Sequence, residues 1–508
     1  MTVARAHSAT VVGLDGVPVV VECAVGAGLP GLTLVGLPDA AVKESRERIR
    51  SALRHVGFPA PPKNGVVNLA PADLPKSGTA LDLAVALAIL AANGDVPAEA
   101  LDGAMLVGEL GLDGALRPVP GVLALAEAAR DQGKKILVPS ENGPEAAALG
   151  GLVVHAADHL GAAIAHLLGK IPLPKSTPTV ERTATAAAEP DLSDVRGQAV
   201  ARRALEIAAA GGHNLLMTGP PGSGKTMLAR RLPGLLPPLS REESLEVTRI
   251  WSVAGRLPAR SGLLVQRPFR SPHHGASAAA LAGGGSDPRP GELSLAHYGV
   301  LFLDELPEFR RDALEALREP LEDGVVSVAR AAGARTFPAR FLFVAAMNPC
   351  PCGHRGDPRR ECACSPRDVA RYRRKISGPL LDRIDLHVEV PALSSSDFGA
   401  DGDGEPSRAV RARVVAAREV QRARTGDPRL VNAALSGRSG RVALRPTPDA
   451  KALLERAVDR LTLSARAYQR VLRVSRTIAD LAGRTSIGAS EVAEALRYRP
   501  GRETSESS

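Results

Sequence analysis

The most specific chemical signature in the chain is the segment GPPGSGKT at positions 219–226. Its spacing matches the G-x4-G-K-[ST] phosphate loop, whose backbone N–H groups approach the phosphates of a nucleotide. We expect Lys225 to reach the β- and γ-phosphates of ATP, and Thr226 to offer its hydroxyl to Mg²⁺. The other residues assigned to nucleotide binding here are Gly219, Pro220, Pro221, Gly222, Ser223 and Gly224.

Acidic and amide side chains follow two apolar runs that are typical of buried parallel strands. Asp304 and Glu305 come directly after the run 300–303, and Asn348 follows the run 341–346. Because ligands bind where such strands end, we expect Asp304 to hold Mg²⁺ and Glu305 to polarise the attacking water. Asn348 is expected to orient that water, the alternative being an Asn that only forms a turn at a strand end.

Arg383 lies between Asp382 and Asp385, and this position leaves two interpretations open. One is a local salt bridge with either aspartate. The other is an arginine finger that reaches the nucleotide of a neighbouring subunit. Only the second interpretation gives Arg383 a catalytic role.

Four of the five cysteines lie within fifteen positions, in the pattern C-x-C-x9-C-x-C. Four thiolates on one loop are enough for a closed, structural zinc site. The clustering favours metal over disulfides, in a reducing compartment. Two alternatives stay open, namely that His354 replaces one thiolate and that the cysteines are reduced surface thiols. The predicted zinc ligands are Cys350, Cys352, Cys362 and Cys364.

The elements that must position these side chains fall into three regions of the 508-residue chain. A Pro- and Thr-rich stretch at 171–191 and a Ser-, Gly- and Asp-rich stretch at 393–407 are predicted linkers. They separate an α+β region at 1–170, a strand–loop–helix region at 192–392 and a helical region at 408–508, so the fold class is multidomain α/β. We expect strands at 19–25 and 213–218, and helices at 39–55, 81–92, 198–211, 407–425, 449–461, 464–482 and 490–498.

Composition and charge restrict the class of protein and of partner. With 44% hydrophobic and 23% charged residues the chain is expected to be globular, and its net charge of +9 favours polyanionic partners. The longest apolar stretch, at 83–92, is shorter than the roughly 20 residues that span a bilayer. The N-terminus lacks the apolar core of a secretory signal. We therefore predict a cytoplasmic protein with no membrane partner.

Taken in order, the motifs resemble the AAA+ ATPases and, more narrowly, the magnesium-chelatase-like YifB/ComM family. The resemblance covers essentially the whole chain and implies a hexameric ring with ATP between the subunits. The resemblance assigns Val195 to nucleotide binding. It also makes Arg466 the second sensor arginine of the lid, and in relatives with an insert such as 251–294 this arginine acts across the subunit boundary. The segments that carry the resemblance are 194–198, 268–274, 291–309, 345–353, 376–390 and 463–481.

The first region resembles the Lon-protease-type domain of the same family. Ala80 occupies the position of the nucleophilic serine in active Lon proteases, and Leu123 that of the lysine base. Without nucleophile or base there is no dyad to activate, so peptide hydrolysis is not expected. Lys76 and Ser77 are neighbours in sequence, and such neighbours rarely face one another in a productive dyad.

The polymer on which such a ring acts is predicted from the segment 324–341, which has the pattern of a two-stranded hairpin. In related ring motors a hairpin here enters the central pore, where Arg330 and Arg335 would contact DNA phosphates. The resemblance thus implies branch migration or helicase activity in recombination or natural transformation. The alternative is a chelatase-type ATPase subunit that remodels a protein partner. No role is predicted for His273 or His274.

Overall fold

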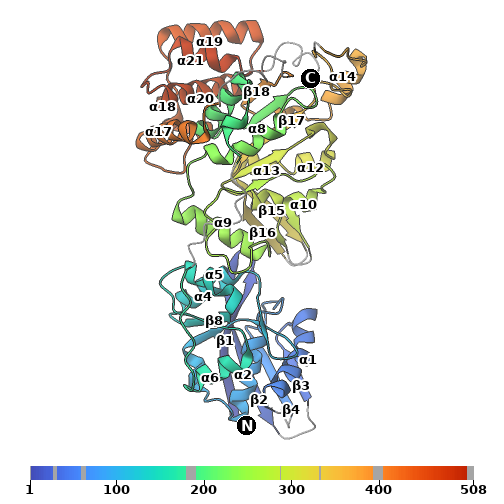
Figure 1. Cartoon of the computed structure of the whole chain (residues 1–508), viewed down its shortest axis with the longest axis vertical. Helices are drawn as coiled ribbons and strands as arrows, with labels where there is room; N and C mark the ends of the chain where they lie inside the picture. The colour runs from blue at the N-terminus through green and yellow to red at the C-terminus, as the bar shows by residue number, and fades with distance from the viewer. Residues whose placement is uncertain are drawn as a thin grey trace. The chain divides into compact units, whose positions relative to one another are not determined.

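The computed structural model describes residues 2–26, 31–58, 64–178, 190–285, 288–330, 333–357, 359–392 and 404–499. Most of each predicted linker, at 179–189 and 393–403, lies outside these residues. The chain forms two compact units, which are described separately below (Figure 1). Unit 1 contains Met1–Thr185 and Ser240–Val265, and unit 2 contains Ala186–Leu239 and Gln266–Ser508.

Unit 1 is built on a seven-stranded mixed sheet with the strand order β3-β4-β2-β1-β5-β8-β9. Helix α2 (Asp82–Asn93) is buried along nearly its whole length, because its sequence is apolar on every side. The strands of the sheet in unit 1 are β1 (Thr2–Val12), β2 (Asp15–Gly26), β3 (Gly31–Val35), β4 (Asn64–Ala70), β5 (Ala104–Leu106), β8 (Lys135–Pro139) and β9 (Val154–Ala157). The other main helices of unit 1 are α1 (Ala40–His55), α4 (Val122–Asp131), α5 (Gly143–Ala148) and α6 (Leu160–Leu167).

The two positions predicted to correspond to a Lon protease dyad, Ala80 and Leu123, lie in or against the hydrophobic core of unit 1. Leu123, in α4, is fully buried, and Ala80 packs against the same apolar cluster. Lys76 is also fully buried, and its Nζ donates a hydrogen bond to the carbonyl oxygen of Pro71. Burial lowers the pKa of Lys76. Lys76 therefore has a backbone partner inside the fold.

One segment of unit 1, Ser240–Val265, comes from the middle of the predicted strand–loop–helix region at 192–392. Helix α9 (Arg241–Val253) begins with a capping box formed by Ser240 and Glu243. Its Ser252 hydroxyl donates to Glu145 Oε1 at 2.5 Å, and Glu145 also accepts the backbone N–H of Leu123 at 2.8 Å. Sequence alone places α9 within the region 192–392. In the structure it packs on α4, since the buried Glu145 carboxylate needs the Ser252 hydroxyl donor.

Unit 2 contains a five-stranded sheet in which every pairing is parallel, with the order β11-β14-β17-β10-β18. All residues of β14 and β17 are buried, as their uninterrupted apolar sequences predict. The predicted mixed α/β class with a parallel sheet is thereby confirmed. The strands are β10 (Leu215–Thr218), β11 (Phe269–Arg270), β14 (Val300–Leu303), β17 (Leu342–Met347) and β18 (Leu386–Glu389), and the first two helices are α7 (Ala199–Gly211) and α8 (Lys225–Arg231).

The C-terminal part of unit 2 is helical, as predicted, and its α17 and α20 pack against α7. Every residue of α20 from Val474 to Asp480 is buried, and its apolar side chains Val471, Leu472, Val474 and Ile478 belong to the hydrophobic core of unit 2. No helix in the described part of the chain is long and apolar enough to cross a membrane. The helices are α17 (Ser407–Thr425), α18 (Gly437–Ala443), α19 (Pro448–Leu461), α20 (Ala465–Leu481) and α21 (Ala489–Leu496).

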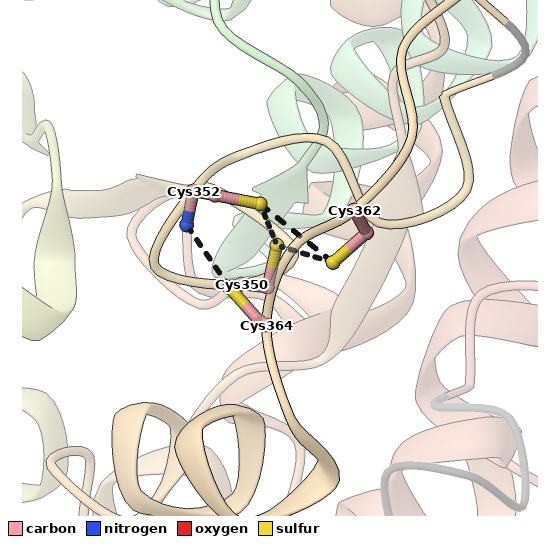
Figure 2. Close-up of side chains that lie close together, drawn as sticks. All are labelled: Cys350, Cys352, Cys362 and Cys364. Carbon is pink, nitrogen blue, oxygen red and sulfur yellow. Dashed lines mark hydrogen bonds between the residues drawn. The ribbon is translucent and has the colours of Figure 1, made fainter.

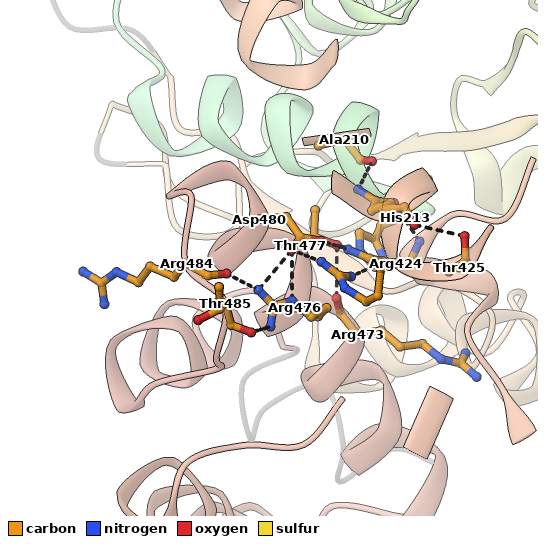
Figure 3. Close-up of polar contacts among 12 residues, drawn as sticks. Ala210, His213, Arg424, Thr425, Arg473, Arg476, Thr477, Asp480, Arg484 and Thr485 are labelled. Carbon is orange, nitrogen blue, oxygen red and sulfur yellow. Dashed lines mark hydrogen bonds and ion pairs between the residues drawn. The ribbon is translucent and has the colours of Figure 1, made fainter. Parts of the chain in front are cut away.

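A buried carboxylate organises the interior of this helical region (Figure 3). Asp480, in α20, has a fully buried side chain and forms ion pairs with Arg424 of α17 and with Arg476 one turn earlier. Its second oxygen accepts a hydrogen bond from Asn432 Nδ2 at 2.8 Å. Asp480 thus gives both arginines an ionic partner, although burial still lowers the pKa of Arg476.

His213 extends the same network into the α/β sheet (Figure 3). Its Nδ1 lies 3.1 Å from Asp385 Oδ2, just before β18, and its Nε2 lies 2.7 Å from the Thr477 hydroxyl on α20. Thr477 also accepts a hydrogen bond from Asn432 at 3.0 Å. These bonds attach α20 to the residues that lead into the two neighbouring strands β10 and β18.

Candidate nucleotide site and cysteine cluster

The parallel sheet of unit 2 brings the predicted nucleotide residues to one edge. Strands β14, β17 and β10 are adjacent, with Leu303 opposite Ala345 and Thr218 opposite Met347. The acidic pair, Asn348 and the phosphate loop each follow one of these strands. Because carboxyl ends of parallel strands share an edge, residues far apart in sequence meet there.

Lys225 joins the phosphate loop to the neighbouring strand. It is the first residue of α8, and its Nζ donates to the carbonyl oxygens of Gly219 at 2.7 Å and Pro220 at 2.9 Å. The same Nζ lies 3.3 Å from Asn348 Oδ1. Burial lowers the pKa of Lys225, while Asp304 and Glu305 act to raise it. The predicted loop lysine and Asn348 are thus in direct contact.

The phosphate loop has room and donors for an anion. Gly222 and Gly224 have φ of +76° and +90°, a region that favours glycine, and a Cβ on Gly222 would meet open space. The Ser223 hydroxyl is buried without a hydrogen-bond partner. Buried polar groups normally have partners, so this orphaned hydroxyl fits a site that receives a polar ligand.

Thr226 and Asp304 form the pair expected to hold Mg²⁺. The Thr226 hydroxyl donates to Asp304 Oδ2 at 2.6 Å. Hydroxyl and carboxylate oxygens are the hard ligands that Mg²⁺ selects, and it keeps waters in its other positions. The two side chains therefore fit the predicted ion, which would be shared with the nucleotide phosphates.

Glu305 is held at its backbone but exposed at its carboxylate. Its φ is +53°, and its N–H donates to Asp304 Oδ1 at 2.9 Å. The side chain is 54% exposed, and Oε2 lies 3.3 Å from Nδ1 of His274. The sequence assigns no role to His274. Its position in the motif at 268–274, after a strand next to β14, is the signal that points to this contact.

The local salt bridge considered for Arg383 is not formed, which corrects that interpretation. Asp382 pairs instead with Arg470 of α20 at 3.2 Å, and Asp385 pairs with His213. Arg383 forms an ion pair with Glu322, and its side chain is only 11% exposed. Both aspartates instead pair with residues from distant parts of the sequence, Arg470 on α20 and His213 shortly before β10.

The remaining predicted residues lie in different surroundings. Arg466 is exposed in the first turn of α20, and Val195 is fully buried in the apolar core of unit 2. In the hairpin of β15 (Val325–Arg330) and β16 (Gly333–Pro338), Arg335 is half-buried and pairs across from Val328. The roles predicted for these residues stay predictions.

The four clustered cysteines converge, as Figure 2 shows. All ligand atoms of the group lie within 4.8 Å of one another, and three Sγ–Sγ distances are 3.4, 3.6 and 3.6 Å. A tetrahedral zinc ion with Zn–S bonds of about 2.3 Å would separate its sulfur atoms by about 3.8 Å. The backbone N–H of Cys352 also donates to Cys364 Sγ at 3.4 Å. This arrangement fits one tetrahedral metal ion.

The cysteine loop touches the phosphate loop. Gly353 has φ of +84°, and a Cβ there would come within 2.7 Å of the Pro221 ring. His354, the alternative ligand, instead has Nδ1 at 3.4 Å from Asp357 Oδ2, and among the described residues the candidate metal-binding group consists of the four cysteine thiols. Since Cys350 follows Asn348 by two residues, the cluster and the nucleotide site share one loop.

Comparison with known families yields three matches along the chain. Residues 191–398 match the family described as magnesium chelatase, subunit ChlI. Residues 21–142 match the family described as subunit ChlI of Mg-chelatase. Residues 404–499 match magnesium chelatase, subunit ChlI C-terminal.

Full-length relatives resemble this chain closely. An uncharacterized protein of Mycobacterium tuberculosis is 50% identical over 503 residues, covering 98% of this chain and 99% of the relative. The uncharacterized protein YifB of Escherichia coli is 47% identical over 503 residues, covering 98% and 97%. The competence protein ComM of Haemophilus influenzae is 45% identical over 504 residues, covering 98% of each.

Two substitutions test the roles assigned at the sheet edge. Glu305→Gln should retain ATP binding and lose hydrolysis by about 100-fold or more, because it removes the carboxylate that polarises water. Lys225→Ala should weaken nucleotide binding itself, because the ammonium that meets the phosphates is lost. Binding of a fluorescent ATP analogue and steady-state phosphate release measure the two effects. Near-normal turnover by Glu305→Gln would refute its role, and intact affinity in Lys225→Ala would refute the phosphate-loop assignment.

Proposed function

This chain belongs to the magnesium-chelatase-like family of AAA+ ATPases that includes YifB and ComM, and from that premise we propose that it is a hexameric, Mg²⁺-dependent ATPase motor that acts on DNA. The observation that carries the ATPase part is the convergence of Lys225, Asn348, Thr226 and Asp304 through two direct contacts at one sheet edge. The name of the ComM relative, a competence protein, supports a DNA-related role. Branch migration or helicase-like unwinding is the proposed work.

The chemistry follows from the residues at this edge. Lys225 and the loop N–H groups bind the phosphates, and Thr226 and Asp304 would hold Mg²⁺, which would supply positive charge against the charge that develops during transfer. Glu305 takes a proton from water as the water oxygen bonds to the γ-phosphorus, and the bond to the bridging oxygen breaks to leave ADP and phosphate. Asn348 is proposed to orient the water, and the contact of its Oδ1 with Lys225 at 3.3 Å supports a position beside the phosphates.

Arg383 is proposed to act on the nucleotide of a neighbouring subunit. Its guanidinium has a buried Nε without a hydrogen-bond partner, and Glu322 holds another of its nitrogens. Arg383 would exchange Glu322 for the γ-phosphate when subunits meet. Exposed Arg466 is the second arginine proposed to act across this boundary.

Mixing variants tests the role of Arg383. Arg383→Ala subunits should assemble but fail to hydrolyse ATP, and mixing them with Lys225→Ala subunits should restore part of the rate, since some interfaces then pair an intact arginine with an intact loop. Glu322→Gln is the control, because it keeps Arg383 while removing the ion pair, and it should remain active. Failure of every mixing ratio, with Glu322→Gln equally inactive, would leave Arg383 with a structural role.

The hairpin of β15 and β16 is the proposed DNA contact. Val326, Val328 and Phe337 are buried and fix its base. Arg330 and Gly333 are the last described pair of the hairpin, and residues 331 and 332 lie outside the described chain. Arginines near the end of a hairpin suit phosphate contacts, because guanidinium groups bind phosphate through a fork of donors.

Salt dependence of DNA binding tests the hairpin and separates the two functions. Replacing Arg330 and Arg335 by Ala should weaken binding and reduce the log–log salt slope by roughly 0.7 to 0.9 for each lost phosphate contact. Replacing exposed Lys451 and Arg456 of α19 removes equal charge elsewhere and should leave the slope unchanged. An unchanged salt slope in the hairpin variant would refute the DNA contact. If the unmodified protein binds no form of DNA, the chelatase-type ATPase that remodels a protein partner is favoured, which the ChlI family matches suggest.

The cysteine cluster is proposed to bind one structural zinc ion through Cys350, Cys352, Cys362 and Cys364. Zinc would close the loop between β17 and α14 (Pro366–Arg373) and so hold Gly353 against Pro221 of the phosphate loop. Four thiolates leave no open position for substrate, which makes the site structural.

Metal analysis tests this site directly. The protein purified under reducing conditions should contain about one zinc ion per chain, and replacing both Cys350 and Cys352 by Ser should abolish it, because two of four ligands are lost. Cys23→Ala, in β2 of unit 1, is the control that should retain the metal. The double variant should also bind ATP more weakly. A metal-free, fully active protein would refute the proposal.

A further inference from the structure

The motif PFRSPHH at 268–274 has no part in the function proposed above, yet the sheet delivers it to the nucleotide edge. Strand β11 pairs in parallel with β14, with Phe269 opposite Val300 and Arg270 opposite Leu301. Arg270 forms a two-bond ion pair with Glu292, at 2.6 and 2.7 Å, which anchors the end of β11. The residues that follow are therefore directed to the edge that carries Glu305.

Neighbouring rings hold the imidazole of His274. The ring centroid of His273 lies 4.0 Å away, and Phe309 meets His274 edge-on at 6.5 Å and 81°. His273 Nδ1 accepts the backbone N–H of Gly275 at 3.1 Å, which fixes its own orientation. The packing on His274 limits its rotation while leaving Nδ1 beside the Glu305 carboxylate.

Glu305 needs such a partner because little else holds its side chain. The Glu305 side chain is more than half exposed. Among the described residues, its carboxylate has one ion-pair contact, in which Oε2 lies 3.3 Å from Nδ1 of His274. A hydrogen bond from Nδ1 to Oε2 would leave Oε1 to accept a proton. Restricting a catalytic group to its productive geometry raises the rate of the reaction without adding contacts to the substrate.

We propose that His274 is the positioning residue of Glu305: its Nδ1–H holds Oε2 so that Oε1 faces the attacking water. This inference rests on the proposed ATPase function. His274 touches neither phosphate nor water in this account and acts only through Glu305. It gives the histidine of the motif at 268–274 a chemical reason for its place after β11.

Two amide substitutions distinguish positioning from packing. The amide nitrogen of His274→Asn falls near the place of Nδ1, whereas that of His274→Gln falls near the place of Nε2. We expect His274→Gln and His274→Ala to lower kcat for ATP about tenfold with KM changed less than twofold, and His274→Asn to recover most of the rate. Thermal unfolding of each variant checks that all three fold equally well.

A double-mutant cycle provides the second readout. In a Glu305→Gln background, His274→Gln should cause no further loss of single-turnover rate, because the group it positions is gone. Equal kcat for the Asn and Gln variants, a change in KM alone, or an additive loss in the cycle would overturn the role of His274 while leaving the ATPase function intact. Normal hydrolysis by Glu305→Gln would instead overturn the proposed function of the site, and the role of His274 with it.

Discussion

The parallel pairing of β14, β17 and β10 is the constraint on which the rest of unit 2 depends. It aligns the carboxyl ends of three buried strands, so that the Asp304–Glu305 pair, Asn348 and the phosphate loop meet although about 130 residues separate the first motif from the last. The two contacts at this edge, Lys225 with Asn348 and Thr226 with Asp304, follow from that alignment. The edge strand β11 pairs with β14 and adds the motif at 268–274 to the same edge, where His274 contacts Glu305.

A second set of buried polar contacts links this edge to the helical region. Residues on both sides of Arg383 are attached to α20, Asp382 directly through Arg470 and Asp385 through His213 and Thr477. Asp480 in turn connects α20 with α17. The segment that carries Arg383 is therefore attached to the helical region on both sides of that residue. The cysteine loop lies against Pro221 of the phosphate loop, and Asn348, two residues before Cys350, contacts Lys225.

Sequence predicts the features that depend on local pattern. The apolar run of β14 predicts a buried strand, the glycines of the phosphate loop predict left-handed φ, and the helical period of 407–425 predicts α17. Each of these features depends on residues that are close together in the sequence. Features that depend on distant partners are not predicted by such patterns. Arg383 has Glu322 as its partner and not its adjacent aspartates, Ser240–Val265 packs in unit 1, and His274 meets Glu305, because each contact joins segments whose spacing carries no periodic signal.

The central claim is that this site drives a motor on DNA, and one assay tests it most directly. ATP hydrolysis by the full-length protein should be measured without DNA and with single-stranded, duplex and four-way-junction DNA, using Glu305→Gln as the blank. The account predicts Mg²⁺-dependent hydrolysis that at least one of these DNA forms stimulates severalfold. Hydrolysis that is the same with every DNA form as without DNA would contradict it.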